Sequence, residues 1–116
     1  MKKILIVDDS RVSRKMNSKI LVELGHEIVG EAVDGLDGLQ KLKELDVDLI
    51  VTDIEMPNLD GIGMVQKIRD EGNNISVVVA STIVNNHLLQ EVIRLKAGVV
   101  KKPIKKKLLA NAIEMV

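Results

Sequence analysis

Short runs of apolar residues alternate along the chain with longer stretches in which apolar side chains recur every three or four positions. The short runs are rich in β-branched residues and carry no charge, which is typical of strands buried on both faces of a parallel sheet. They lie at Ile4–Val7, Leu49–Val51, Ile75–Ala80 and Gly98–Val100, with a weaker candidate at Ile28–Val29. We therefore expect five strands.

The stretches between these strands have the spacing of amphipathic helices. In the first, Val12, Met16, Ile20 and Leu24 form a stripe at every fourth position. Ser10 before this stripe can cap the helix, and Gly25 after it can end the helix. Four more helices are predicted around Leu36–Leu42, Met64–Ile68, Leu88–Ile93 and Leu108–Val116. Asp34 and Gly35 are expected to form a turn before the second helix, and Asn85 or Asn86 to cap the fourth.

Strict alternation of strands and helices predicts an α/β fold, in which a five-stranded parallel sheet is flanked by five helices. Right-handed crossovers place these helices on both faces of the sheet. A common strand order for such a sheet is 2-1-3-4-5, with ligands bound beyond the carboxyl ends of strands one and three. We expect one domain over residues 1–116, with no effector domain within the chain.

Polar residues follow four of the predicted strands at the point where each strand ends. Asp8 and Asp9 follow the first strand, Asp53 the third, Ser81 the fourth and Lys102 the fifth. Taken singly, each has an ordinary structural explanation, such as a helix cap, a loop acid or a solvated lysine. Because the carboxyl ends of parallel strands share one edge of the sheet, all these side chains are expected to converge there. The separate explanations do not account for that convergence.

Three carboxylates at one edge repel one another unless a cation lies between them. A pair about 4 Å apart costs roughly 1 kcal/mol in bulk water and about 4 kcal/mol at an effective dielectric near 20. Mg²⁺ relieves this repulsion and is suited to a few carboxylates, waters and a phosphate oxygen. With Mg²⁺ bound, one carboxylate can attack a phosphoryl group while the metal and an ammonium neutralise the transferred oxygens. The residues thus predict an aspartyl-phosphate site.

Composition narrows the possible functions further. The chain has 17 basic and 17 acidic residues, so no charge excess favours nucleic acid, an anionic membrane or an acidic substrate. The lysines at positions 101–107 are interpreted as a solvated helix start rather than a nucleic-acid contact. Cysteine and aromatic residues are absent, which excludes disulfides, thiolate metal sites and stacking platforms for bases. No apolar run is long enough to span a membrane, and we expect a cytoplasmic protein.

Four blocks of the sequence resemble the receiver domains of two-component response regulators, in particular the single-domain chemotaxis regulators. The blocks are ILIVDDS, LIVTDIEMPNLDG, VVVAST and VVKKPI, and in this order they span essentially the whole chain. The resemblance implies the flavodoxin-like fold of that family. It also implies a signalling switch that is controlled by phosphorylation and requires Mg²⁺.

The resemblance assigns a role to each residue that matches the family's motifs. Asp53 is implied as the phosphoacceptor, and Asp9 as a direct ligand of Mg²⁺ that Asp8 assists. Glu55 is implied to contribute its backbone carbonyl to the metal. Ser81 is implied as the hydroxyl that follows the phosphoryl group, and Lys102 as the ammonium that contacts it.

Three positions depart from the family pattern. Val99 stands where an aromatic residue often reports phosphorylation through its rotamer, so an aromatic rotamer switch is impossible in this chain. Ile104 replaces a common Phe, and Thr82 a frequent Ala. The interval from Ser81 to Lys102 is slightly short, which leaves Thr82 as an alternative to Ser81 for the switch hydroxyl.

We expect a switch that receives its phosphoryl group from a histidine kinase or phosphotransfer protein. It then binds a downstream protein differently through its fourth helix, fifth strand and fifth helix, and it is not a turnover enzyme. The altered positions leave open a constitutive interaction module of the same fold. A haloacid dehalogenase-like phosphohydrolase is disfavoured, because such enzymes place a second Asp two positions after the nucleophile, where this chain has Glu55.

Overall fold

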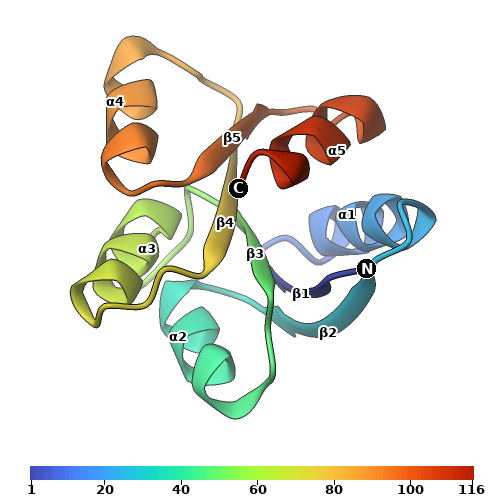
Figure 1. Cartoon of the computed structure of the whole chain (residues 1–116), viewed down its shortest axis with the longest axis horizontal. Coiled ribbons are helices and arrows are strands. Elements are labelled where there is room, and N and C mark those ends of the chain that lie inside the picture. Colours follow the sequence, from blue (N-terminus) through green and yellow to red (C-terminus); the bar gives the residue numbers. More distant parts are fainter.

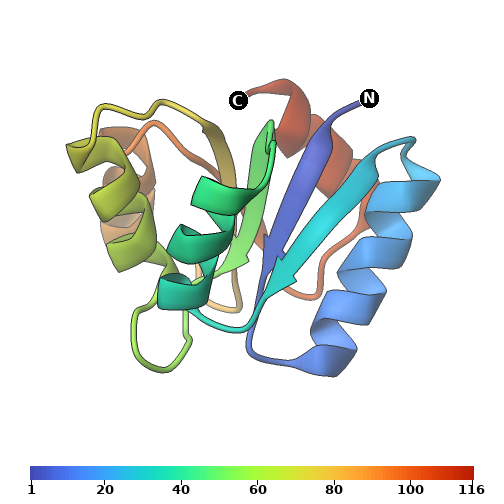
Figure 2. The same ribbon diagram turned by 90° about the horizontal axis from the view of Figure 1, so that it is seen from below.

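The predicted strands form a single parallel sheet in the computed structural model, which describes residues 1–116 (Figure 1). The strands lie in the order β2-β1-β3-β4-β5, which confirms the predicted order. Every neighbouring pair is parallel, so all the carboxyl ends reach the same edge of the sheet, at the bottom of Figure 2. The bounds are Lys3–Val7 for β1, Glu27–Ala32 for β2, Leu49–Asp53 for β3, Ser76–Ser81 for β4 and Gly98–Lys101 for β5.

Five helices connect or follow the strands, as predicted. Helices α1 and α5 cover one face of the sheet, and α2, α3 and α4 cover the other (Figures 1 and 2). None of them combines the length and the hydropathy that crossing a membrane requires. The bounds are Arg11–Glu23 for α1, Gly35–Glu44 for α2, Gly61–Asp70 for α3, Asn86–Arg94 for α4 and Lys106–Glu114 for α5.

Side chains that alternate along the central strands divide the core into two layers. Ile6 of β1 packs in one cluster with Leu109 of α5, and its neighbour Leu5 packs in the other cluster with Met64 of α3. The buried apolar residues are all Ile, Leu, Val, Met or Ala. Because both faces of the central strands are covered, these strands read as continuous apolar runs rather than as an alternating pattern.

The apolar stripe of α1 does not mark the buried side of that helix. Val12 and Met16 are 70% and 62% exposed, whereas the buried residues of α1 are Asn17 and Leu21. A stripe at every fourth position rotates by about 40° per step around a helix of 3.6 residues per turn. Its members therefore cannot all face the sheet, and the early ones lie in solvent.

Two of the predicted caps are confirmed, and one predicted turn is wrong. The Ser10 side chain accepts the Ser13 N–H and begins α1, and Asn85, not Asn86, caps α4. Asp34 lies in the N-cap of α2 instead of in a free turn, because its Oδ1 accepts the Asp37 N–H at 2.8 Å.

The edge strand β2 is longer than its apolar residues suggest. It spans Glu27–Ala32, whereas only Ile28–Val29 was predicted, and its register with β1 shifts between Ile4 and Leu5. An edge strand pairs on one side only, so it accepts exposed charges such as Glu31 that a fully buried strand excludes.

Candidate functional site

The acidic residues predicted at the strand ends meet at one point of the sheet. Asp8 and Asp9 follow β1, and Asp53 ends the neighbouring strand β3, in which Thr52 lies opposite Val7. One carboxylate oxygen from each acid lies within 4.8 Å of the others. The predicted convergence of these two acidic segments is confirmed, and a cation placed between them can interact with all three carboxylates.

Asp8 is the buried member of this acidic cluster, with 2% of its surface exposed. Its Oδ1 accepts a hydrogen bond from the Ser10 N–H at 2.9 Å, whereas its buried Oδ2 has no hydrogen-bond partner. A buried carboxylate oxygen without a partner raises the free energy of the folded chain. Since this oxygen lies beside two more carboxylates, the donor set fits a hard cation with oxygen ligands, such as Mg²⁺.

Lys102 brings a positive charge to the acidic cluster. Its Nζ lies 2.8 Å from Oδ1 of Asp53, and the two side chains are 21% and 13% exposed. The Lys102 N–H donates to the Ser81 carbonyl at 2.8 Å, which continues the pairing of β5 with β4 beyond the end of β5. Three carboxylates and one ammonium leave two net negative charges, which a divalent cation balances.

The two oxygens of Asp53 have different surroundings. Oδ1 contacts Lys102 and accepts the Ile54 N–H at 2.8 Å. Oδ2 has no hydrogen bond from the protein. It is therefore the oxygen that is available to attack an electrophile or to bind a cation.

Gly61 allows the loop after Asp53 to fold back onto β3. Its N–H donates to the Ile54 carbonyl at 2.8 Å, and a Cβ at this position would lie 2.1 Å from the Asp53 carbonyl oxygen. Any side chain would push α3 away from the strand end. The close approach of Gly61 to Asp53 therefore brings together the two ends of the loop that contains Glu55.

A small cavity of about 110 Å³ adjoins Asp53. Besides Asp53 and Lys102, the residues around it include Glu55, Ser81 and Thr82. The Ser81 hydroxyl is engaged with its own loop, since Oγ donates to the Ile83 carbonyl at 2.8 Å and accepts the Ile83 N–H at 3.2 Å. Both candidate hydroxyls thus border the site, and the choice between them stays a prediction, as does the role of the Glu55 carbonyl.

The aliphatic replacements Val99 and Ile104 pack into the two core layers. Val99 of β5 is half-buried against the layer under α2, α3 and α4, and Ile104 is half-buried against the layer under α1 and α5. Both side chains contribute to the core, beside the surface that was predicted to change on phosphorylation.

Two contacts that hold the loops of the site were not predicted. The Arg14 Nη1 donates to the Asp8 carbonyl at 2.8 Å, and the Asn58 side-chain amide donates to Asp34 Oδ2 at 2.7 Å. Both join residues across the loops at the carboxyl edge of the sheet. A helical arginine directs its side chain towards the helix N-terminus, which is the one signal that could have indicated Arg14.

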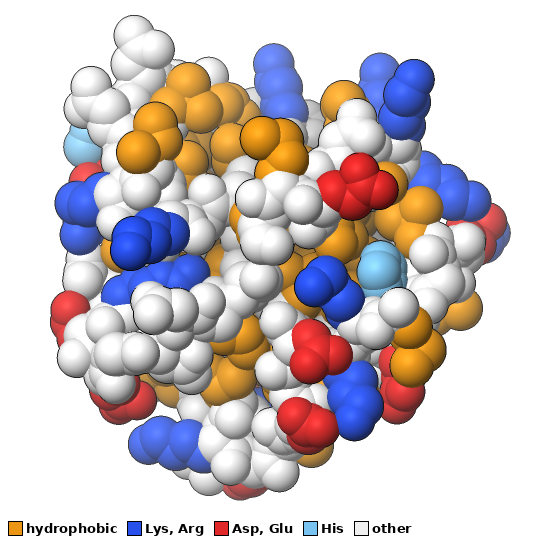
Figure 3. Space-filling view, viewed as in Figure 1, with side chains coloured by type: hydrophobic (Ala, Val, Ile, Leu, Met, Phe, Trp, Pro, Cys, Tyr) orange, Lys and Arg blue, Asp and Glu red, His pale blue; other side chains and the backbone are white.

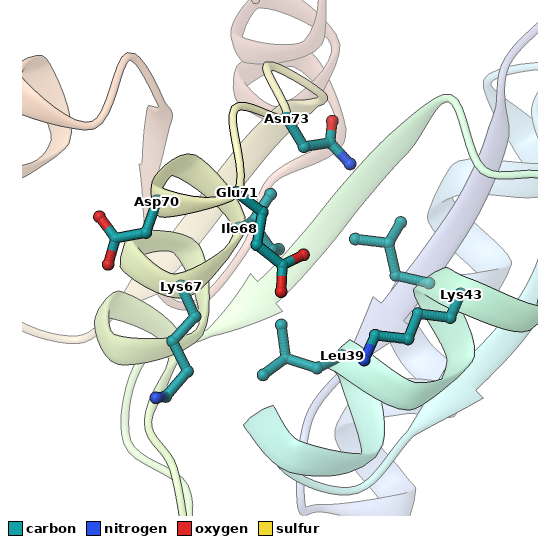
Figure 4. Close-up of a pocket in the computed structure, with 8 residues that line it drawn as sticks. Leu39, Lys43, Lys67, Ile68, Asp70, Glu71 and Asn73 are labelled. Carbon is teal, nitrogen blue, oxygen red and sulfur yellow. The ribbon is translucent and has the colours of Figure 1, made fainter.

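A larger hollow lies elsewhere, between α2 and α3, and measures about 490 Å³ (Figure 4). Leu39 and Ile68 line its apolar floor, and charges of both signs, including Lys43 and Glu71, surround it. None of the residues of the acidic cluster lines it. Because helices in this fold run antiparallel to the strands, the C-terminal turns that form it lie at the opposite edge of the sheet.

The family model of the response regulator receiver domain matches residues 4–114. The chain belongs to this family. Among its relatives, the chemotaxis protein CheY of Treponema pallidum is 36% identical over 117 residues, covering 98% of this chain and 81% of that protein. A chain of the CheX-CheY-BeF3-Mg²⁺ complex from Borrelia burgdorferi superposes with a TM-score of 0.90 at 27% identity, covering 97% of this chain and 86% of that one.

This receiver domain is closely related to CheY, which is consistent with a phosphorylation-dependent signalling switch. Other relatives are named as enzymes. A protein-glutamate methylesterase/protein-glutamine glutaminase of Nocardioides sp. is 41% identical over 97 residues, which cover 83% of this chain but 26% of that protein. The activity in that name belongs to a much longer protein.

Proposed function

We propose that the receiver domain accepts a phosphoryl group on Asp53 from a histidine kinase or phosphotransfer protein. In this proposal Asp8, Asp9 and Asp53 bind Mg²⁺, together with the backbone carbonyl of Glu55. The observation that carries the proposal is the buried Oδ2 of Asp8, which has no partner in the protein and lies beside two further carboxylates. The family match supports the same assignment.

The phosphoryl transfer is a displacement at phosphorus. Asp53 Oδ2 attacks the phosphorus of the donor, an O–P bond forms, and the P–N bond of phosphohistidine breaks with its electron pair going to the imidazole nitrogen. When bound, Mg²⁺ neutralises charge on the phosphoryl oxygens. Lys102 contacts Asp53 Oδ1 before transfer and the transferred oxygens afterwards.

The signal leaves the site through the loop after β4. Ser81 exchanges its hydrogen bond to the Ile83 carbonyl for one to a phosphoryl oxygen, which draws the loop towards Asp53. The movement alters the surface of α4, β5 and α5, where the downstream protein binds. Val99 has no aromatic ring to report the change, so the loop backbone and α4 transmit it.

Acetyl phosphate with Mg²⁺ tests the phosphorylation directly. Intact-mass spectrometry of rapidly quenched samples should show one added phosphoryl group on the wild type and none on Asp53→Asn. Asp70→Asn, which removes an exposed carboxylate at the opposite edge, serves as the control and should react like the wild type. Labelling of Asp53→Asn to the wild-type level, or an unlabelled wild type with Mg²⁺ present, would contradict the proposal.

The switching step has its own test. A downstream protein is first captured with the receiver domain in a pull-down. Its affinity for the wild type should change when beryllofluoride and Mg²⁺ are added. Ser81→Ala should lose this change, and Thr82→Ala should keep it. An affinity that beryllofluoride leaves unaltered would favour the constitutive module, and loss of the change in Thr82→Ala alone would move the switch role to Thr82.

A further inference from the structure

Arg14 joins the acidic segment after β1 to helix α1 and strand β2. Its side chain is 14% exposed, although arginine is usually found at the surface. Nη1 donates to the Asp8 carbonyl at 2.8 Å, and Nε donates to Glu31 Oε1 at 3.1 Å. Arg14 belongs to the first turn of α1, from which a helical side chain points back towards the residues before the helix.

The Arg14 contact completes a set of hydrogen bonds that fixes Asp8. The Asp8 N–H donates to the Ala32 carbonyl at 3.0 Å, and its Oδ1 accepts the Ser10 N–H. With the Asp8 carbonyl bound by Arg14, the buried Oδ2 is the one polar atom of Asp8 that lacks a partner. The peptide that joins Asp8 to Asp9 is held by the same contact, so both carboxylates start from a fixed backbone.

Glu31 is the acidic partner of the Arg14 guanidinium. Arg14 lies only six positions after Asp8, yet its hydrogen bonds go to a backbone carbonyl and to Glu31. Lys102, in contrast, pairs directly with a carboxylate of the cluster. Glu31 balances the charge of Arg14, so that Arg14 braces the acidic segment without taking the place of a cation.

We propose that Arg14 is a positioning residue of the cation site, which holds the Asp8 carbonyl so that the Asp8 and Asp9 carboxylates face the bound metal. The inference rests on the proposed function, since it presupposes Mg²⁺ binding at the acidic cluster. Its physical basis is that outer hydrogen bonds orient ligands, and their loss commonly weakens metal binding by about 10-fold to 100-fold.

The sign of the effect distinguishes positioning from simple electrostatics. Arg14→Met keeps an unbranched stem in the same space but removes every donor and one positive charge. Electrostatics alone predicts tighter Mg²⁺ binding, because a cation near the site has gone. Positioning predicts weaker binding, by about 10-fold or more.

Lys19→Met is the matched control, since Lys19 is exposed on the same helix and forms no ion pair. It loses the same charge without touching the acidic segment, and we expect a dissociation constant equal to that of the wild type or slightly lower. Arg14→Lys retains the charge but cannot hold the Asp8 carbonyl and Glu31 at once, so a smaller loss of about threefold is expected.

Mg²⁺ titrations of the full chain, followed by the amide signals of Asp9 and Asp53, give the dissociation constants. Thermal melts without Mg²⁺ identify any variant that does not fold; Arg14→Lys decides the matter if Arg14→Met is unfolded. Weaker binding in the folded Arg14 variants but not in Lys19→Met supports the inference. Wild-type or tighter binding in either folded Arg14 variant overturns it while leaving the proposed function intact. A wild type that binds no Mg²⁺ overturns the proposed function instead.

Discussion

Charged side chains are distributed differently at the two edges of the sheet. At the carboxyl edge, three carboxylates and one lysine crowd together, and one buried carboxylate oxygen has no partner. At the amino edge, the α2–α3 hollow is more than four times larger, but charges of both signs surround it (Figure 4). Basic and acidic side chains are likewise interspersed on the face that contains the chain termini (Figure 3).

The difference shows that charge balance indicates function better than the size of a hollow does. A hollow with mixed charges is satisfied by water and has no need of a particular ligand. A cluster of like charges with an unpartnered buried oxygen is stabilised by a bound counterion. We therefore assign the chemistry of the domain to its smaller cavity.

The largest expected effect comes from replacing Lys102 at the carboxyl edge. Lys102→Gln removes the ammonium that pairs with Asp53, and we expect phosphorylation by acetyl phosphate to slow by about 10²-fold to 10³-fold. Lys43→Gln removes a lysine from the amino edge and should leave the rate unchanged. Quench-flow intact mass measures both rates, and an equal effect of the two substitutions would remove the distinction between the edges.

A glycine substitution at the carboxyl edge should lower the free energy of unfolding more than one at the amino edge. Gly61→Ala places Cβ against the Asp53 carbonyl oxygen, and we expect a loss of about 3 kcal/mol in the free energy of unfolding. Gly72→Ala meets open space and has only a positive φ of 77° to oppose it, so a loss of about 1 kcal/mol is expected. Urea unfolding measures both, and a Gly61→Ala protein as stable as the wild type would contradict the close approach.

Removing a carboxylate from the acidic cluster should stabilise the protein when no metal is present. Asp8→Asn relieves repulsion and an unpartnered charge, so we expect a gain of about 1–2 kcal/mol in the free energy of unfolding in EDTA. The same substitution should abolish the extra stability that Mg²⁺ gives to the wild type.

Glu71→Gln at the amino edge is the control for Asp8→Asn, and it should change stability by less than about 0.5 kcal/mol in either buffer. A destabilised Asp8→Asn protein in EDTA would show that the acidic cluster is not under repulsion.

The smallest changes in the free energy of unfolding are expected from pH. One titrating residue at each edge of the sheet should cause such a change, each in its own pH range. Hydrogen bonds from the Asp37 N–H and the Asn58 side chain lower the pKa of Asp34 below its usual 3.8, so Asp34 stabilises the fold above that pH and this contribution is lost as the solution becomes more acidic. Burial, followed by the charges of the N-terminus and Lys2, lowers the pKa of His26 below 6.5. The unfolded chain then binds the proton more readily, so stability falls as pH drops below 6.5.

Urea midpoints between pH 7 and 3 should separate these windows. Substituting His26 by Gln should flatten the upper part of the profile, and Asp34→Asn the lower part. If both variants keep the wild-type profile, the pKa directions are wrong.

The positions of the acids and Lys102 could be predicted because each follows an apolar run, and parallel strands bring the ends of such runs to one edge. The central strands could be predicted because both of their faces are buried, so that they appear in the sequence as continuous apolar runs. The buried side of α1 could not be predicted from its stripe: Leu21 is buried and Val12 is exposed, because a stripe at every fourth position winds around the helix.

The supporting contacts of the site could not be predicted either. Arg14 meets Asp8 through a turn whose geometry the spacing of residues does not give, and Asn58 meets Asp34 across 24 positions. Each of these residue types is common at a surface, so nothing in the local pattern separates them from solvated neighbours except the direction in which a helical arginine points. Their roles follow only from the packing of one loop against the next.

An NMR titration of the ¹⁵N-labelled receiver domain with Mg²⁺ tests the central claim most directly. The account predicts saturable shifts at the amides of Asp8, Asp9 and Asp53, and unchanged signals for Leu39 and Asn73 around the α2–α3 hollow. Unchanged signals at the three aspartates over the whole titration would contradict the claim that the carboxyl edge is a divalent-cation site.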